Sequence, residues 1–225
     1  VLKLDSMGFQ LHFHAIGDAA IRQSLDSLEN AARINGVRDS RHHLSHIELF
    51  NPDDVGRLRD LNVVANFQPY WAWADQFITE LTMPKLGPER SKWLYPIGSI
   101  LKTGAVVAFG SDWFVTSGNP MLGIETAITR KDPLTNQSDD FLLHERINLA
   151  DAIAAYTING AYVNFMENDA GSIEVDKYAD LIVIDRNLFK IPETEISEAN
   201  VVLTLLDGEL VYGDWDMKVL KKTAL

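Results

Sequence analysis

The chain has 225 residues, which is long enough to bury a large core, and its 46% hydrophobic and 23% charged residues are typical of a globular protein. Its formal net charge of −12 argues against a nucleic-acid partner, because binding a polyanion requires a basic surface. The sequence contains no cysteine, which excludes disulfides and cysteine-bound zinc and leaves histidine and carboxylate side chains as the strong metal ligands.

No apolar run approaches the roughly 20 residues that a membrane-spanning helix requires, so we expect no membrane partner. The absence of cysteine is compatible with a reducing compartment, and we expect a cytoplasmic protein. The chain begins with Val1, and residues 1–8 are typical of the end of a helix that stops at Gly8. We therefore expect the C-terminal portion of a longer protein, which leaves secretion open because a signal peptide would lie upstream.

Residues 11–18 have the pattern of an apolar strand that carries two histidines and then breaks at a glycine. Alternate side chains of a strand share a face, so His12 and His14 are expected to point the same way. Gly17 permits a sharp turn, and Asp18 can cap the helix that follows and stops at Gly36.

The alternation of strands and helices continues along the chain. Further strands are predicted over residues 41–49, 63–68 and 105–109, with helices over 52–61 and 96–102. Apolar strands that alternate with helices indicate a parallel sheet covered on both faces.

Residues 70–95 show no periodic pattern and hold three tryptophans, which is typical of a lid or a binding loop. Helices are predicted over 120–130 and 149–165. After Gly171, short apolar or alternating runs joined by turns such as Asp207-Gly208 predict a small β module. We accordingly divide the chain into a region of residues 1–168 and a β module of residues 169–225.

Three predicted strands end at residues that can bind a metal or work beside one: His14, His46 and Asp112. In a parallel α/β barrel the carboxyl ends of the strands meet at the active site. Each residue alone has an ordinary structural explanation, because strand histidines often pack in cores and Asp112 would suit a turn or a helix cap. Their joint occurrence leaves the metal site and the structural explanation equally open.

Several short motifs carry a resemblance to a known family. The motifs are His-Ala-Ile-Gly-Asp-Ala-Ala at 14–20, Gln68-Pro69, Phe-Gly-Ser-Asp at 109–112, Asn119-Pro120, Thr129-Arg130, Ala-Tyr-Thr-Ile-Asn-Gly-Ala at 155–161, and the tail at 171–173 and 177–183. In combination they resemble the amidohydrolase superfamily, in the branch of N-substituted formamide deformylase-like metal-dependent hydrolases. The resemblance implies an α/β fold: the C-terminal half of a (β/α)₈ TIM-type barrel, strands five to eight, followed by part of a small β-sandwich module.

The resemblance also implies the metal ligands. His14 matches the ligand on the fifth strand, His46 the ligand on the sixth, and Asp112 the eighth-strand aspartate that binds metal and acts as general base. The family's His-x-His pair on strand one and its lysine or glutamate on strand four are absent here. Ser45 also stands where relatives often carry glutamate, for which Glu48 could substitute only if the strand bends. The implied cofactor is a divalent metal, Zn²⁺ being expected, with one or two ions in the complete enzyme.

Other side chains are candidates for contact with substrate. Arg130 could hold a substrate carboxylate or carbonyl, or form a plain salt bridge. Trp71 and Trp73 could line an apolar pocket or simply cover the mouth of the barrel, and Gln68 is placed with them as substrate-binding. We expect His12, one layer deeper than His14, to support the ligands rather than to bind metal.

These inferences predict a metal-dependent hydrolase acting on carbon–nitrogen bonds of a small amide or formamide. Asp112 would take the proton of a metal-activated water and return it to the leaving nitrogen. The alternative is a catalytically silent half-barrel that serves as a binding or assembly module. In either case we expect a missing N-terminal half of the barrel or a second copy as partner, because half a barrel exposes sheet edges and favours association, including a homo-oligomer.

Overall fold

The computed structural model describes residues 1–214 of the chain, and its centre is a four-stranded parallel sheet. The strands are β1 (His12–Ala15), β2 (His43–His46), β3 (Val64–Phe67) and β4 (Val107–Phe109), and they lie in the order β1-β2-β3-β4. Every neighbouring pair is parallel, as the alternation of elements predicts. Their carboxyl ends therefore lie along one edge of the sheet, although each strand is shorter than predicted.

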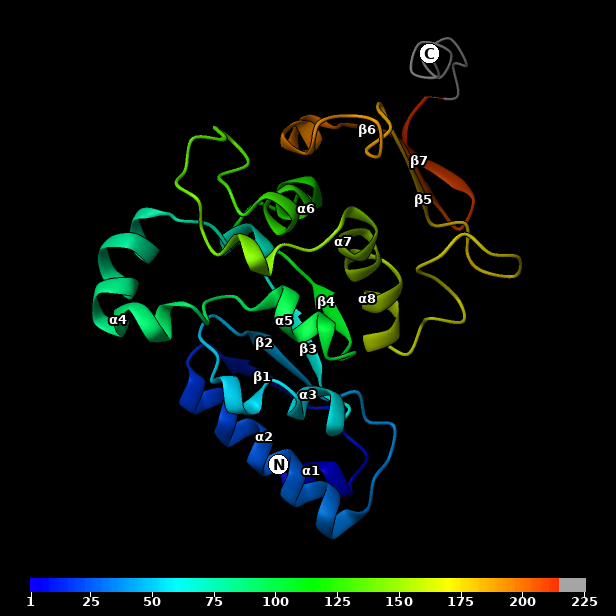
Figure 1. Cartoon of the computed structure of the whole chain (residues 1–225). Coiled ribbons are helices and arrows are strands. Elements are labelled where there is room, and N and C mark those ends of the chain that lie inside the picture. The colour runs from blue at the N-terminus through cyan, green and yellow to red at the C-terminus, as the bar shows by residue number, and fades with distance from the viewer. Residues whose placement is uncertain (215–225) are drawn as a thin grey trace.

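Helices connect the strands and cover the sheet (Figure 1). They are α1 (Leu2–Ser6), α2 (Asp18–Asn35), α3 (Arg57–Asp60), α4 (Met83–Ser91), α5 (Ile97–Lys102), α6 (Pro120–Thr129), α7 (Leu149–Tyr156) and α8 (Ile158–Val163). In the view of Figure 1, α1 and α2 lie below the sheet, whereas α6 and α7 lie above it. The described part of the chain thus has the layered α/β arrangement that was predicted.

The amphipathic helix α2 shows how the hydrophobic pattern determines the core. Ile21, Leu25 and Leu28 are buried on one face of this helix, in the same core cluster as Leu44 of β2. The helix ends at Gly36, whose φ of 89° lies in the region that favours glycine. This element therefore agrees with the prediction along its whole length.

The predicted loop over residues 70–95 is wrong in its middle. The segment contains a 3₁₀-helix η2 (Pro69–Trp71), a π-helix η3 (Phe77–Thr82) and the helix α4. Helix α4 is interrupted at Gly87, where φ is 73°, and it holds proline at 84 and 88. These helix-breaking residues obscure the helical period in the sequence.

Two other predicted helices are shorter or divided. The helix expected over 52–61 is a 3₁₀-helix η1 (Pro52–Asp54) followed by α3, and the helix expected over 149–165 is divided into α7 and α8. The division falls at Thr157, whose φ of −121° and ψ of −93° are not helical.

The β module predicted for the tail is a three-stranded antiparallel sheet in the described residues. Strands β5 (Leu181–Ile184), β6 (Val201–Leu206) and β7 (Glu209–Gly213) lie in the order β5-β6-β7, with the predicted Asp207-Gly208 turn between β6 and β7. A 3₁₀-helix η5 (Glu193–Glu198) joins the tail to α6, because the backbone N–H of Ser197 donates to Glu125 Oε2 at 2.7 Å. Residues 215–225, which end the predicted module, lie outside the described residues.

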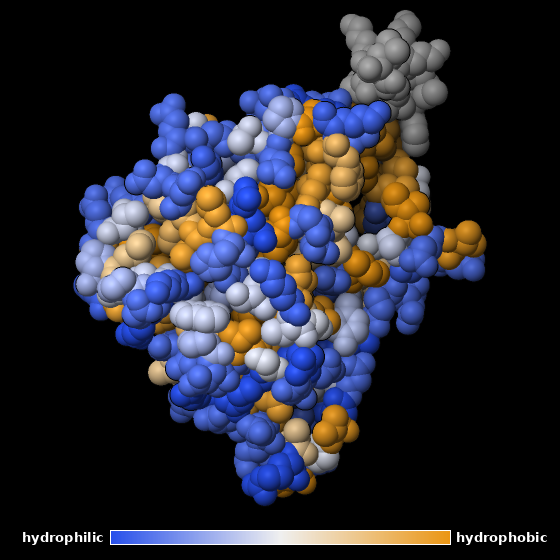
Figure 2. All heavy atoms as spheres, in the orientation of Figure 1, coloured by the Kyte–Doolittle hydropathy of each residue, from blue (hydrophilic) through white to orange (hydrophobic). Residues whose placement is uncertain are grey.

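Apolar side chains also gather on the surface between the helices and the tail sheet, as Figure 2 shows over α6, α7 and the tail strands. Across residues 1–214, no helix is both long enough and apolar enough to cross a membrane.

Candidate metal centre

The imidazole rings of His14 and His46 meet edge to face at the carboxyl ends of β1 and β2. Their centroids are 4.4 Å apart and the planes are inclined by 66°. Strict strand alternation would place His46 on the face of Leu44, which is fully buried in the core. Instead His46 has a φ of 81° and Ile47 a φ of 51°, so that the chain turns out of the regular strand there. Positive φ values in non-glycine residues cost about 1–3 kcal/mol and concentrate at functional sites.

A hydrogen bond fixes the orientation of the His46 ring. Nδ1 of His46 lies 2.8 Å from Oε1 of Gln68, the residue that follows β3. Since a carboxamide oxygen only accepts, Nδ1 is the protonated nitrogen, and Nε2 keeps the lone pair that a metal ion requires. Gln68 is only 4% exposed, and its NH₂ group faces Asn66 Oδ1 at 3.5 Å. The structure therefore places Gln68 as the positioning partner of His46, a role that the sequence did not indicate.

The electrostatics of His46 also favour a neutral ring. Burial lowers its pKa, as does the nearby His14, whereas the bond to Gln68 and the charge of Asp112 act in the opposite direction. Metal ions bind the neutral imidazole, so a lowered pKa keeps the ligand form populated at neutral pH.

Asp112 lies three residues after the end of β4, and β3 separates that strand from β2. It is exposed and has a φ of 55°, and its backbone carbonyl accepts a hydrogen bond from the N–H of Val115 at 2.7 Å. Its negative charge acts on His46 and opposes the lowering of the pKa of that ring.

The donor set fits a metal in part. Two imidazoles are adjacent and one of them has its tautomer fixed, which suits Zn²⁺. No group of three histidine, aspartate or glutamate side chains within residues 1–214 is arranged closely enough to hold an ion. The structure thus brings His14 and His46 together but does not bring Asp112 into ligand contact with them.

His12 lies beside another histidine rather than beneath His14. Its ring meets that of His43 edge to face, with centroids 4.7 Å apart, and the two residues are register partners of β1 and β2. His43 is buried, and burial lowers its pKa. The contact between His12 and His43 was not among the predictions. The alternation of the strand places His43 on the same face as Ser45.

Trp71 forms a wall of the site. Its ring stacks on His46 with centroids 5.5 Å apart and planes 13° from parallel. Trp73 is half-buried two residues further on, where its backbone N–H donates to the Trp71 carbonyl at 3.0 Å. Of the two predicted tryptophans, Trp71 is therefore the one in contact with a candidate ligand.

The predicted contact of Arg130 with substrate does not agree with the structure. Arg130 is completely buried at the end of α6, and its guanidinium donates to the backbone carbonyls of Tyr95 at 3.0 Å, Leu94 at 3.3 Å and Phe141 at 3.4 Å. Burial lowers the pKa of Arg130 to about 10. Arg130 has a φ of 60° at the end of α6, and its side chain is directed into the core. There it joins α6 to the segments of residues 94–95 and 141. It forms no ion pair within residues 1–214.

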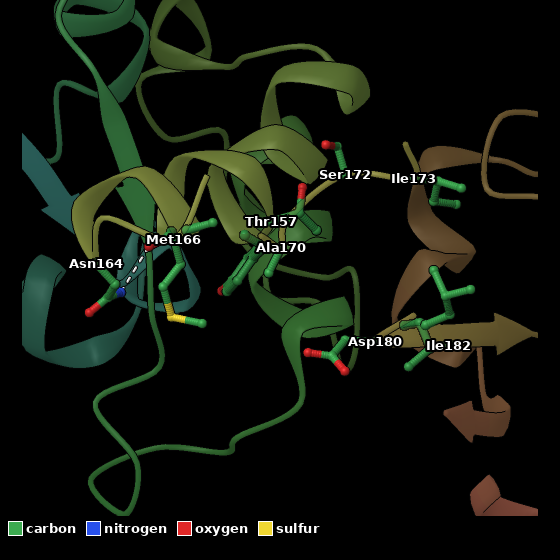
Figure 3. A pocket seen from close by; sticks show the side chains of 13 residues that line it. Thr157, Asn164, Met166, Ala170, Ser172, Ile173, Asp180 and Ile182 are labelled. Carbon is green, nitrogen blue, oxygen red and sulfur yellow. Dashed lines mark hydrogen bonds between the residues drawn. The ribbon is translucent and has the colours of Figure 1, made fainter. Parts of the chain in front are cut away.

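A separate cavity of about 440 Å³ lies between α8 and the tail (Figure 3). Its labelled side chains are mostly small or apolar, including Thr157, Met166, Ala170 and Ile182. Asp180, also drawn there, accepts the backbone N–H of Asp207 at 2.8 Å. This cavity offers no cluster of catalytic groups, so the strand ends remain the candidate site.

A parallel sheet connected and covered by helices, with two adjacent histidines where its strands end, defines an α/β protein whose candidate site lies at the carboxyl ends of the strands. The chain belongs to the amidohydrolase family, which its sequence matches over residues 1–212. The family resemblance seen in the motifs is thereby confirmed.

Individual relatives match almost the whole chain. It is 34% identical over 209 residues to the protein LONG AFTER FAR-RED 3 of Arabidopsis thaliana, covering 92% of this chain and 35% of that protein. It is 29% identical over 213 residues to the N-substituted formamide deformylase of Arthrobacter pascens, covering 94% of this chain and 38% of that enzyme.

Among solved structures, an uncharacterized metal-dependent hydrolase of Pyrococcus horikoshii superposes with a TM-score of 0.70 at 26% identity, covering 84% of this chain and 36% of that one. The chain thus spans little more than a third of the length of each of these relatives.

Proposed function

We propose that this chain supplies part of the active site of a metal-dependent hydrolase that cleaves the carbon–nitrogen bond of a small amide or formamide. The observation that carries the proposal is the His14–His46 ring pair, with the tautomer of His46 fixed by Gln68. The similarity to a formamide deformylase and to a metal-dependent hydrolase supports the same reaction class.

His14 and His46 would hold a divalent ion, for which we propose Zn²⁺, together with Asp112. Such an ion makes bound water a nucleophile at neutral pH and polarises a carbonyl. Asp112, exposed at the same edge of the sheet, would take the proton from the attacking water and pass it to the leaving nitrogen, which must be protonated before it departs. Trp71, stacked on His46, would limit access of bulk water to that side of the ligand.

We also propose that further strands complete the sheet. Within residues 1–214 the outer strands β1 and β4 have one neighbour each, so the sheet can extend on both sides. The added strands would come from a longer polypeptide that contains this chain or from a second copy of it, and they would bring the additional ligands.

The experiment is a hydrolysis assay on this chain and on any longer polypeptide that contains it, with N-benzylformamide as substrate and release of benzylamine as readout. We expect hydrolysis that a chelator abolishes, that added Zn²⁺ restores, and that Asp112→Asn lowers at least 100-fold. Asp139→Asn, an exposed carboxylate elsewhere, is the matched control. No hydrolysis by either protein, or hydrolysis unaffected by chelator and by Asp112→Asn, would support the catalytically silent alternative instead.

A further inference from the structure

A cavity of about 440 Å³ lies next to the histidine pair and shares a wall with it. That wall is Trp71, which stacks on His46 and also lines the cavity. The cavity lies between the π-helix η3 and the segment after Asp112, which contributes Val115 and Thr116. Its volume is within the range of pockets that bind small molecules.

The walls of this cavity are mainly apolar. Ile78 is buried at 3% exposure, whereas Phe77, Leu81 and Val115 are each more than half exposed. Exposed apolar side chains around a cavity gain free energy when an apolar molecule covers them. The shape and composition therefore suit a ligand with a hydrocarbon or aromatic body.

Polar side chains also line this cavity: Glu48, Asp75 and Tyr95, together with the hydroxyl groups of Thr82 and Thr116. The carboxylate of Glu48 is half-buried and makes no hydrogen bond with any residue of 1–214. Asp75 uses one oxygen to accept the backbone N–H of Ile78 at 2.7 Å, which leaves its second oxygen available. Tyr95 is only 4% exposed; its hydroxyl makes no hydrogen bond within residues 1–214 but is not fully buried, because the buried polar atoms without a partner there are Glu125 Oε1 and Asn136 Oδ1.

Glu48, Asp75 and Tyr95 act on one another electrostatically. After burial, the charges of Glu48 and Asp75 raise the pKa of Tyr95, whereas the charge of Arg130 lowers it. All three groups line one cavity, where the Tyr95 hydroxyl can accept a hydrogen bond from a bound ligand.

The two carboxyl groups of the cavity have no cationic partner within residues 1–214. Neither Glu48 nor Asp75 forms an ion pair within residues 1–214. Arg130 contacts the segment of Tyr95, but its guanidinium donates to the backbone carbonyls of Tyr95 and Leu94 and to neither carboxylate. Partly buried carboxylates that lack a cation are costly, and a ligand cation would offset that cost. An anionic ligand would be repelled, and a neutral one would leave the carboxylates unpaired.

We propose that this cavity binds the part of the substrate attached to the amide nitrogen, and that this part has an apolar body ending in a protonated amine. The ammonium group would lie among Glu48, Asp75 and the Tyr95 hydroxyl, and the body would pack against Trp71 and the apolar rim. The identification of the bound molecule as a substrate rests on the proposed function. The prediction that the cavity binds an amine does not depend on it.

The first test is calorimetric binding to the 225-residue chain, in the presence of a chelator, of three probes of similar size: 2-phenylethylammonium, 2-phenylethanol and 3-phenylpropionate. We expect the cation to bind at least tenfold more tightly than the alcohol, and the carboxylate not to bind. Equal affinity for cation and alcohol would overturn the proposal.

Variants of the polar residues of the cavity test where 2-phenylethylammonium binds. Glu48→Gln should weaken binding of 2-phenylethylammonium at least tenfold while leaving that of 2-phenylethanol unchanged, and Asp75→Asn should act in the same direction. Tyr95→Phe, which keeps the buried ring and removes only the hydroxyl, should also weaken binding of the cation. Glu80→Gln, an exposed carboxylate on the same π-helix, is the control and should change nothing. Unchanged binding of the cation to folded Glu48→Gln would contradict the assignment.

The outcome can be separated from that of the hydrolysis assay. If 2-phenylethylammonium binds through Glu48 but no amide is cleaved, the proposed function fails and the amine site stands. If amides are cleaved but N-benzylformamide and its 4-aminomethyl derivative have equal KM values, the amine site is wrong. With both proposals correct, Glu48→Gln raises KM for the cationic amide by a larger factor than KM for the neutral amide.

Discussion

Oε1 of Gln68 accepts the Nδ1–H of His46 at 2.8 Å, which joins the residue after β3 to the last residue of β2. Because neighbouring parallel strands end at the same edge of the sheet, the two side chains meet although 22 residues separate them. The bond determines which nitrogen of His46 is free to bind a metal, so the amide of Gln68 would act on a bound ion without touching it.

Removal of this bond should weaken metal binding. We expect Gln68→Leu to lower the affinity for Zn²⁺ by about 10- to 100-fold, as loss of partners of ligating histidines does, while Gln68→Glu retains an acceptor and loses less. Calorimetric titration measures both, with Gln76→Leu, at an exposed position, as the control. Equal affinities of wild type and folded Gln68→Leu would show that the bond does not position His46.

A second prediction concerns the packing of α6 against the ring of Tyr156. A Cβ on Gly123 would lie 2.0 Å from the Tyr156 hydroxyl and 3.1 Å from Pro69 Cγ, and the Tyr156 ring is held against Phe109 at a centroid distance of 5.3 Å. We expect Gly123→Ala to lower the free energy of unfolding by about 1–3 kcal/mol.

The matched control is another helical glycine. A Cβ on Gly160 in α8 would meet nothing within 4 Å, so Gly160→Ala should be neutral or should stabilise the chain by up to about 1 kcal/mol through helix propensity. Denaturant unfolding measures both changes. If the two variants had equal stability, the close approach of α6 and Tyr156 would be refuted.

Arg130 should be a determinant of stability. Its replacement by methionine leaves three backbone carbonyls in two segments without their donors, and we expect a loss of about 3 kcal/mol in the free energy of unfolding. Arg33→Met, at an exposed position of α2, should cost much less. A thermal midpoint unchanged by Arg130→Met would contradict the structural role and return Arg130 to the candidates for substrate contact.

The pH dependence of stability should include a contribution from His42. Its Nδ1 accepts the N–H of Leu11 at 3.0 Å and its Nε2–H donates to Asp5 at 3.1 Å, so the neutral ring is the form that the fold accommodates. Burial lowers the pKa of His42, the positive charge of Arg38 lowers it further, and Asp5 opposes both.

The lowered pKa of His42 determines whether stability rises or falls with pH. Below about pH 7 the unfolded chain, in which histidine has a pKa of about 6.5, takes up more protons than the folded one, so stability falls as the pH falls. Thermal unfolding from pH 7.5 to 5 should show a smaller decline for His42→Asn than for wild type, with exposed His144→Asn as the control. Identical slopes for His42→Asn and wild type would refute the contribution.

Much of the fold was predictable because it depends on local patterns. The period of α2, the stop at Gly36 and the apolar run that forms β4 are each encoded within a few neighbouring residues. The helices of residues 77–91 were not predictable in this way, because Pro84 and Gly87 interrupt their period while packing against the rest of the chain maintains them.

Part of the candidate site was also predictable from the sequence, and part was not. The order of strand ends predicted that His14 and His46 lie close together, which the ring distance of 4.4 Å bears out in geometry while their metal-binding role stays a prediction. The role of Gln68, the burial of Arg130 and the contact of Trp71 with His46 depend on backbone turns with positive φ and on neighbours distant in sequence. No pattern along the chain indicates such relationships.

The most direct test of the central claim is calorimetric titration of the metal-free 225-residue chain with Zn²⁺ at pH 7.5. We expect binding of zinc that His14→Ala and His46→Ala each weaken at least 100-fold and that Asp112→Asn weakens at least tenfold, whereas His144→Ala, an exposed histidine, has no effect. Absence of zinc binding by the wild-type chain, or undiminished binding by folded His14→Ala and His46→Ala, would contradict the assignment of the metal centre.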